Sequence, residues 1–418
     1  MKGDFSRLTF DPKKHYRRVL MQQGRVQVDS DWNEQDAINQ YRAEILARDI
    51  IGRCGAPLHD GGFKISVNNK GELVIAKGRF YADGILCEND DDAGYLQQLD
   101  LPDAPKPANV LQTMPVGIVY LDVWERHLTA LDDPGIREVA LGGPDTATRS
   151  RVVWQVKILP IKTGSGAHPV CGSKFAEWRV LTAPSNATLN ARTHPRYQRS
   201  ENQLYRVEVH KSGPLGTATF KWSRDNGSVL ATIEEITGNE ITVSAARPDN
   251  VLRFANGQWV EVVDDRLELL GQPGPLIQIN KVDTATRVVT VKTTPAGIDQ
   301  RMHPKLRRWD SIGEMKIEVP STNDGWIELE GGIQVHFGAG SYRAGDYWLI
   351  PARTATGDIE WPPFQTPNVT QLPQPPAGIE HHYCRLALIQ LTRNRLQVIE
   401  DCRPLFPPLI EIASGLFK

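Results

Sequence analysis

Cysteine is scarce in this chain of 418 residues, and the five cysteines are odd in number and far apart. They are Cys54, Cys87, Cys171, Cys384 and Cys402. Small domains that depend on disulfides carry many closely spaced cysteines, mostly in oxidising compartments. The pattern therefore predicts free thiols and synthesis in a reducing compartment.

Long apolar runs are also missing. No segment reaches the roughly 18 consecutive apolar residues of a membrane helix. The charged start, Met1–Phe5, is not followed by the apolar stretch of a secretory signal. The sequence therefore predicts no membrane insertion and no signal peptide.

Neither sign of charge dominates. Lys and Arg number 48 and Asp and Glu number 50, which gives a net charge of −2 and a pI near 6.6. A nucleic-acid-binding protein usually has a basic face and a pI above about 9. The densest basic run, residues 13–18, is typical of a solvated arm or of a contact with an acidic partner protein. We expect no nucleic-acid partner.

Catalytic signatures are absent as well. The sequence has no Walker-type phosphate loop, no Gly-x-Ser-x-Gly elbow, no His-Glu-x-x-His and no paired Cys-x-x-Cys. We expect no catalytic residue, no cofactor and no metal, and we predict that the protein is not an enzyme.

The best metal candidate combines His382 and Cys384 on one face of a strand with Cys402 on a partner strand. Zinc would need a fourth ligand such as His381, which faces the other way. We interpret these residues as buried thiols and hydrogen-bonded histidines. The acidic turn 89–92 lacks the ligand spacing of a calcium loop and is interpreted as solvated.

Candidates for glycan chemistry are weak. The pairs Asp264-Asp265 and Glu234-Glu235 would point to opposite faces of a strand, although carboxylates from distant segments could still meet at about 5–9.5 Å. Exposed tryptophans could form a sugar-binding platform, but most tryptophans belong to cores or interfaces. The platform candidates are Trp309, Trp326, Trp348 and Trp361.

What the sequence does contain begins with an arm and a helix. Asp31 and Glu34 have the spacing of a capping box, which predicts a helix from Asp31 to about Ile51. Ile38, Tyr41 and Ile45 form one apolar row, and Leu46 and Ile50 widen it on one side. Because a helix on a single sheet needs only one face, the second row predicts a subunit interface. The apolar residues of the arm have no periodic partner in the chain, so the arm is expected to dock on a neighbouring subunit; an arm folded back on its own domain is the alternative.

Beyond residue 57 the apolar period changes to two, which indicates strands. Hairpins are predicted for 63–75 and, across Asn226-Gly227, for 220–232. A strand with a bend permitted by glycine is predicted at 80–87, a linker at 101–115, a pairing of 117–124 with 151–158, and short barrel or sandwich strands at 240–291. The fold class is mainly β and multi-domain, with small β-barrels or sandwiches after the arm and one long amphipathic helix. The expected segments are 1–55, 56–110, 111–235, 236–300 and 301–418.

The first 35 residues carry a resemblance. Met1–Arg7, Thr9–Pro12, Tyr16 and Val19–Gln35 resemble the opening of a family of unknown function found beside genes of phage-tail-like contractile injection systems. The same opening is similar to that of tailed-phage baseplate and fibre proteins. The resemblance extends to segments 120–126, 220–228 and 345–351.

The resemblance implies a structural, baseplate- or spike-associated component of such a particle, attached to other tail proteins through its arm. It also implies a homo-oligomer, a trimer or hexamer that matches tail symmetry, made in a bacterial cytoplasm and built into the particle. A receptor- or glycan-binding tail fibre protein, with a cell-surface glycan as ligand, is the alternative, and a particle-borne glycan hydrolase is a third. The residues expected to serve assembly are Phe5, Phe10, Tyr16, Leu20, Gly24, Arg25, Trp32, Ile38, Tyr41, Ile45, Leu46 and Ile50.

Overall fold

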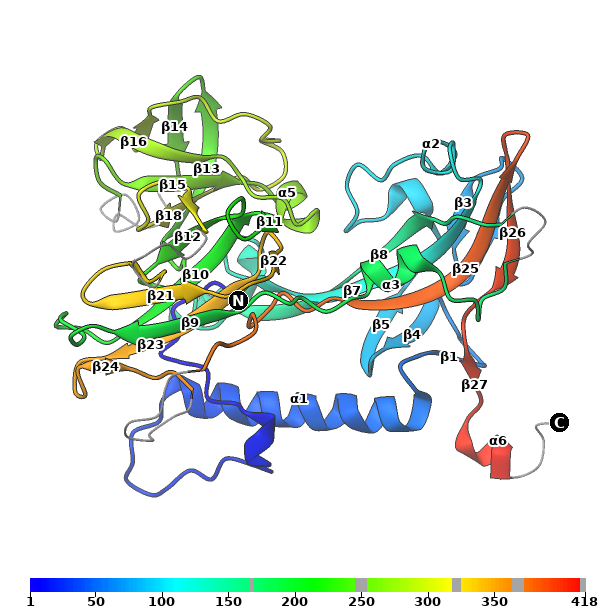
Figure 1. Cartoon of the computed structure of the whole chain (residues 1–418), viewed down its shortest axis with the longest axis horizontal. Coiled ribbons are helices and arrows are strands. Elements are labelled where there is room, and N and C mark those ends of the chain that lie inside the picture. Colours follow the sequence, from blue (N-terminus) through cyan, green and yellow to red (C-terminus); the bar gives the residue numbers. More distant parts are fainter. Residues whose placement is uncertain (165–168, 245–253, 318–324, 363–371, 414–418) are drawn as a thin grey trace.

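The computed structural model describes residues 1–164, 169–244, 254–317, 325–362 and 372–413. Within these ranges the chain is mainly β, as the sequence predicts, and its strands form seven sheets, one of them a closed barrel. Figure 1 shows two parts side by side. One part combines strands from both ends of the sequence, and the other is built from the middle of the chain.

The terminal part has three sheets, with strand orders β26-β25-β7-β8, β27-β1-β4-β5 and β2-β3-β6. They enclose one core, in which Phe63 and Phe80 lie with Leu121 and Leu386. Residues from both ends of the sequence therefore depend on each other for burial. The strands are β1 (Cys54–Pro57), β2 (Ile65–Val67), β3 (Leu73–Ile75), β4 (Gly78–Ala82), β5 (Ile85–Asn89), β6 (Ala93–Gly94), β7 (Val116–Leu128), β8 (Arg149–Pro160), β25 (His382–Thr392), β26 (Arg395–Asp401) and β27 (Leu405–Phe406).

Two pairings predicted for this part are confirmed: β2 pairs with β3, and β7 pairs with β8 along its whole length. The single strand predicted at 80–87 is wrong, because β4 and β5 form a hairpin there. Gly84 lies in the turn between them with φ +94°, and a Cβ on it would lie 2.1 Å from the carbonyl oxygen of Glu44. Only glycine permits this close approach to the helix.

The middle part contains a sandwich of a five-stranded sheet, β19-β12-β10-β23-β24, and a three-stranded sheet, β20-β21-β9, with the pair β11-β22 beside them. Aromatic side chains fill its core, including Tyr205, Phe220, Phe337 and Trp348. The strands are β9 (Leu189–Thr193), β10 (Gln203–Lys211), β11 (Gly213–Pro214), β12 (Thr219–Ser223), β19 (Met315–Lys316), β20 (Ile327–Glu328), β21 (Ile333–Phe337), β22 (Ser341–Tyr342), β23 (Tyr347–Arg353) and β24 (Asp358–Ile359).

The barrel predicted among the short strands is present, in the order β13-β14-β17-β16-β15-β18. Its core is aliphatic, with Ile241, Val260 and Leu306 among its buried residues. The barrel extends beyond the expected segment 236–300 at both ends, because its first and last strands are needed for closure. The strands are β13 (Leu230–Thr237), β14 (Glu240–Val243), β15 (Trp259–Val263), β16 (Leu276–Asp283), β17 (Val288–Val291) and β18 (Lys305–Trp309).

The hairpin predicted across Asn226-Gly227 is wrong. The turn itself has the left-handed backbone that this dipeptide favours, with φ of +50° and +64°. However, β12 leaves the turn to pair with β10 and β19, whereas β13 pairs with β14 and β18 in the barrel. The turn is present as its local sequence predicts, but long-range pairing places the two flanking strands in different sheets.

Short helices occupy several connections. The linker predicted at 101–115 holds α2 and packs Leu101 and Leu111 into buried positions, so it is part of the folded body. The short helices are η1 (Pro12–Lys14), η2 (Tyr95–Gln97), α2 (Pro107–Val110), η3 (Pro134–Ile136), η4 (Val139–Leu141), α3 (Ala176–Leu181), α5 (Asp265–Leu269) and α6 (Leu409–Ala413).

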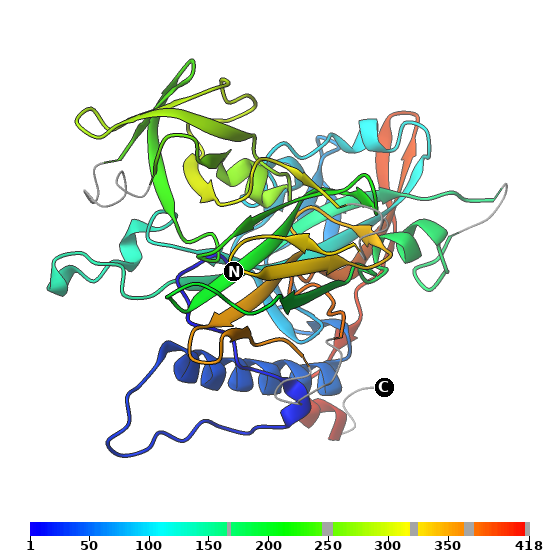
Figure 2. The ribbon, with the colours of Figure 1, turned by 60° about the vertical axis from the view of Figure 1, so that its left-hand side comes forward.

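The one long helix, α1 (Asp29–Ile51), runs along one side of the molecule beneath both parts (Figures 1 and 2). It begins two residues before Asp31, after Val28, which provides no side-chain cap. The predicted capping box is therefore wrong: the carboxylate of Glu34 instead accepts a hydrogen bond from the Thr9 hydroxyl at 2.7 Å. The arm therefore binds the Glu34 carboxylate that was expected to cap the helix. No helix within the described ranges is both long enough and apolar enough to cross a bilayer.

The prediction of free thiols is wrong for four of the five cysteines, so the cysteine pattern no longer supports the expected reducing compartment. Disulfides join Cys54 to Cys384 and Cys171 to Cys402, with Cα–Cα distances of 5.9 and 5.3 Å. These distances lie within the usual range for disulfides. The partners are 330 and 231 residues apart in the sequence, so only the folded sheets bring them together. Cys87 is free and buried.

We expect one titratable thiol per chain when the purified protein is denatured without reductant, and five after reduction. The single thiol is Cys87, because the other four cysteines are paired. Thiol titration with peptide mapping under non-reducing conditions measures both the number and the pairing. Five free thiols before reduction would contradict the assignment.

Candidate functional site

The first residues of the arm are docked on their own chain. Phe5 packs edge-on against His127, with ring centroids 5.8 Å apart, and Phe10 lies 5.6 Å from the ring of Tyr41. The backbone N–H of Ser6 donates to the carboxylate of Asp29 at 2.9 Å. The expectation that the apolar residues of the arm lack partners in the chain is therefore wrong for Phe5 and Phe10.

Other apolar residues of the arm and of α1 face outward. The exposed fraction is 58% for Tyr16, 67% for Leu20, 66% for Trp32, 62% for Leu46 and 57% for Ile50. Trp32, Leu46 and Ile50 lie on one stripe of α1, and Tyr16 and Leu20 belong to the arm. Exposed apolar patches on a monomer usually mark an interaction site. We call these five residues the docking face.

The remaining residues expected to serve assembly have other positions. Gly24 forms an exposed turn with φ +69°, and Arg25 beside it is exposed. Ile38 is buried and Ile45 is half-buried, so both face the body, while Tyr41 is 40% exposed beneath Phe10. The predicted apolar row of Ile38, Tyr41 and Ile45 thus packs the helix against its own chain.

The docking face continues toward the C-terminal strand. A Cβ on Gly55 would lie 2.7 Å from Ile51 and 3.2 Å from Phe406, so β27 packs beside the end of α1. Both views place α6 near this end of the helix (Figures 1 and 2). The exposed apolar residues here are Leu405, Leu409, Ile410 and Ile412.

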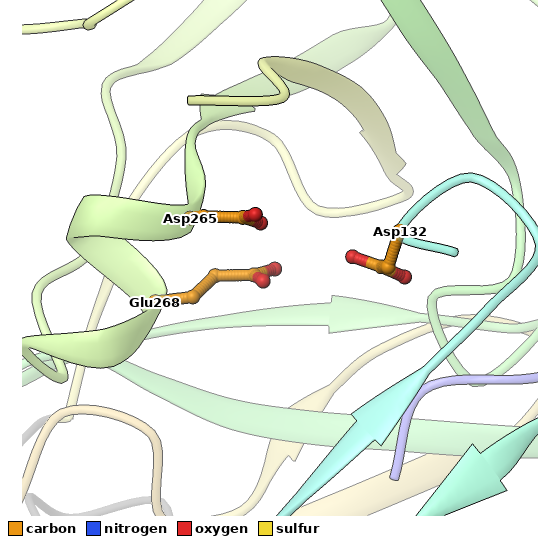
Figure 3. Close-up of side chains that lie close together, drawn as sticks. All are labelled: Asp132, Asp265 and Glu268. Atoms are coloured by element: carbon orange, nitrogen blue, oxygen red, sulfur yellow. The ribbon is translucent and has the colours of Figure 1, made fainter. Parts of the chain in front are cut away.

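Asp132, Asp265 and Glu268 form a cluster of carboxylates in which one oxygen from each lies within 4.8 Å of the others. Figure 3 shows Asp265 and Glu268 pointing from α5 toward Asp132, which lies on the loop after β7. Lys305 contacts all three carboxylates, at 2.8 Å for Asp265 and 3.2 Å for Glu268. Arg126 lies 2.6 Å from Asp265 and 2.8 Å from Glu268.

This cluster is an ion-pair network that joins the barrel to the terminal part. Burial tends to raise the pKa of Asp265, but Lys305 and Arg126 hold that pKa below its usual value. A metal ion would have to displace the buried ammonium group of Lys305, whose side chain is 2% exposed. The geometry therefore favours a structural role for the cluster.

Sequence reasoning missed this cluster because it treated Asp264 and Asp265 as neighbours on a strand. Asp264 instead caps α5 and accepts a hydrogen bond from the N–H of Leu267 at 2.8 Å. Asp at an N-cap followed by acidic residues in the first turn is a helix-start signal that could have found α5.

A second charged cluster lies at the centre of the molecule. Glu208 on β10 contacts Arg206 at 2.6 Å, Lys2 of the arm at 3.1 Å and Lys221 on β12 at 3.4 Å. Lys221 also contacts both carboxylate oxygens of Glu261 at 2.7 Å. Burial alone would raise the pKa of Glu208, but Lys2, Arg206 and Lys221 hold it well below its usual value. The arm is thus anchored in the interior by charge.

The proposed zinc ligands do not meet. The Nδ1 atom of His381 lies 2.7 Å from Asp122, and that of His382 lies 3.1 Å from Asp83. Cys384 and Cys402 belong to different disulfides. The histidines are hydrogen-bonded as expected, whereas the interpretation of the two cysteines as thiols is wrong.

The candidate sugar-binding platform is wrong too. Trp309, Trp348 and Trp361 are buried, with exposed fractions of 1%, 1% and 5%. Trp326 is half-buried, and the guanidinium of Arg192 lies 4.0 Å from its ring centroid. In the acidic turn, the side-chain amide of Asn89 is buried and donates to a backbone carbonyl at 3.1 Å.

Comparison with known proteins gives one match. No curated protein matches the chain significantly, and no solved structure does. One family model covers residues 1–168 and 181–403, which is most of the sequence. The chain therefore belongs to a family of unknown function, DUF6519.

Proposed function

We propose that this protein is a structural, non-catalytic component of a phage-tail-like contractile injection system, associated with the baseplate or spike. It docks there through its arm and α1. The docking face carries this proposal: five large apolar side chains, each more than half exposed, lie on the arm and on the outward side of one helix. The resemblance of the first 35 residues to openings of tail-associated proteins supports the assignment to a particle.

The two faces of α1 support self-association in particular. Ile38 is buried against the body, whereas Leu46 and Ile50, four residues apart, are exposed on the same stripe as Trp32. A symmetry mate could bury this second stripe, as in helical interfaces about a rotation axis. The protein is accordingly proposed to be a homo-oligomer, a trimer or hexamer, made in a bacterial cytoplasm and built into the particle.

Changing Leu46 and Ile50 together to Glu is expected to dissociate the oligomer. Each buried aliphatic side chain contributes roughly 1.5–3 kcal/mol per subunit. Because both side chains are more than half exposed in the single chain, the fold should be retained. Light scattering coupled to size exclusion measures the mass, and circular dichroism checks the fold.

The matched control is Val139→Glu with Leu141→Glu, which changes two exposed apolar residues on the loop after β7, 84% and 70% exposed. This control should keep the mass of the wild type. A monomeric wild-type chain, or a folded double variant of α1 with unchanged mass, would refute the proposed interface.

A further inference from the structure

A cavity of about 860 Å³ lies where the arm, β7, β10 and β18 meet. Its lining includes Lys2, His127, Arg206 and Arg307. The carboxylates of Glu208, Glu261 and Glu268 line it as well, and elsewhere Arg53 and Arg343 lie in the same wall as Asp83 and Glu380. We call the part around Lys2, His127, Arg206 and Arg307 the cationic end.

The cationic end holds one positive charge too many. The two charged clusters together contain six cationic side chains and five carboxylates. The cations are Lys2, Arg126, Arg206, Lys221, Lys305 and Arg307, and the carboxylates are Asp132, Glu208, Glu261, Asp265 and Glu268. Of these six cations, Arg307 is the one that makes no direct ion pair with a described residue, although it helps to lower the pKa of the nearby Glu268.

Arg307 is buried and has few direct partners. It is 5% exposed, and its Nη1 donates to the carbonyl oxygen of Gly227, while its Nε is buried without a hydrogen-bond partner. The side chains of Lys2 and Arg307 pass the same point, each 3.7 Å from where a Cβ on Gly227 would lie. A buried guanidinium that lacks a directly paired carboxylate is unfavourable.

A second unpartnered group lies at this end of the cavity. The Nε2 atom of His127 is buried and has no hydrogen-bond partner among the described residues. Burial and the neighbouring cations lower the pKa of His127 to about 3, so the ring stays neutral, and its Nε2-protonated tautomer can donate one hydrogen bond. Arg126 likewise has a buried Nε without a partner.

We propose that the cationic end of this cavity binds a small oxyanion, a phosphate or carboxylate group, whose oxygens pair with Arg307 and accept a hydrogen bond from His127. A guanidinium group presents two N–H donors in one plane and can bind two oxygens of a phosphate or carboxylate at once.

Thermal unfolding of the full-length protein in sodium phosphate, acetate or chloride at equal ionic strength tests the site. A bound oxyanion should raise the Tm by at least about 2 °C over chloride. Because phosphate also stabilises proteins by exclusion from their surface, only the part of a shift that the Arg307→Met variant loses is assigned to the site. A larger loss in phosphate identifies a phosphate site, and a larger loss in acetate a carboxylate site. Equal melting in all three salts would overturn the proposal.

Variants locate the site. Arg307→Met should abolish the shift and, in chloride, melt no lower than the wild type, because it removes an unmatched buried charge. Arg301→Met, which changes an 89% exposed arginine paired with Asp299, should keep the shift. If Arg307→Met does not fold, Arg307→Lys should weaken calorimetric phosphate or acetate binding about tenfold, the loss of one bidentate pairing. Unchanged binding in either Arg307 variant would overturn the proposal.

Discussion

The Glu208→Gln variant is expected to have a free energy of unfolding about 3–5 kcal/mol lower than that of the wild type, because the change leaves buried cations without their carboxylate. Glu208 is 3% exposed and pairs with Lys2, Arg206 and Lys221. A neutral amide accepts hydrogen bonds but cannot balance these charges. Chemical denaturation followed by tryptophan fluorescence measures the loss, since Trp309 lies 4.5 Å from the ammonium group of Lys221.

The control for this variant is Glu234→Gln. Glu234 pairs with Arg287 at 3.3 Å, but its side chain is 45% exposed. Exposed pairs contribute about 0–1 kcal/mol, so this change should have little effect. A Glu208→Gln variant as stable as the Glu234→Gln control would mean that the central cluster does not hold the arm and the sandwich together.

Stability is expected to fall as the pH is lowered from about 6.5 to 4.5, before most carboxylates titrate. Burial and nearby cations lower the pKa of His127 to about 3 and that of His210 to about 4. In the unfolded chain both rings take up protons near pH 6.5, whereas in the folded chain they stay neutral. Their contribution is thus complete above pH 6.5 and is lost as the pH falls toward the folded pKa values.

Each histidine adds a slope of up to about 1.4 kcal/mol per pH unit. His382 titrates above this range. Burial lowers its pKa, but the hydrogen bond to Asp83 and the carboxylates of Glu380, Asp83 and Glu44 together raise it, so its contribution is complete below pH 6.5 and is lost only as the pH rises. Replacing His210 with Gln should flatten the curve between pH 6.5 and 4.5, whereas His382→Gln should leave that slope almost unchanged. Denaturation curves across this range measure both, and a pH-independent wild type would contradict the assignment of neutral buried histidines.

Much of the strand content could be predicted because it depends on local alternation. The hairpin of β2 and β3, the pair β7–β8 and the barrel strands all show apolar residues at a period of two. The helix α1 was predicted within two residues at its start. These elements need no distant partner to be recognised.

Features that depend on distant contacts were missed. Cys54 and Cys384 form a disulfide although 330 residues separate them in the sequence. The turn at Asn226-Gly227 was expected to connect two paired strands, but the strands on either side of it belong to different sheets. The clusters at Glu208 and Asp265 draw their charges from the arm, β7, the sandwich and the barrel, and no spacing in the sequence encodes such a meeting.

The docking face could be predicted only in part from local periodicity. Periodicity separated the row of Ile38 and Ile45 from that of Leu46 and Ile50, and the structure places the first row against the body and the second outside. The arm was predicted as one unit but is divided: Phe5 and Phe10 are docked, whereas Tyr16 and Leu20 are exposed. Which surface of the body receives the arm depends on tertiary contacts that the sequence pattern does not contain.

Incorporation into the assembled particle tests the central claim most directly. Tail-like particles would be purified from cells that produce either the wild-type chain or the chain with Leu46→Glu and Ile50→Glu, and the chain would be quantified by immunodetection. The proposal predicts that the wild type and the Val139→Glu, Leu141→Glu control co-purify with the particles, whereas the docking-face variant stays in the soluble fraction in folded form. Equal incorporation of all three chains, or the absence of the wild type from the particles, would contradict it.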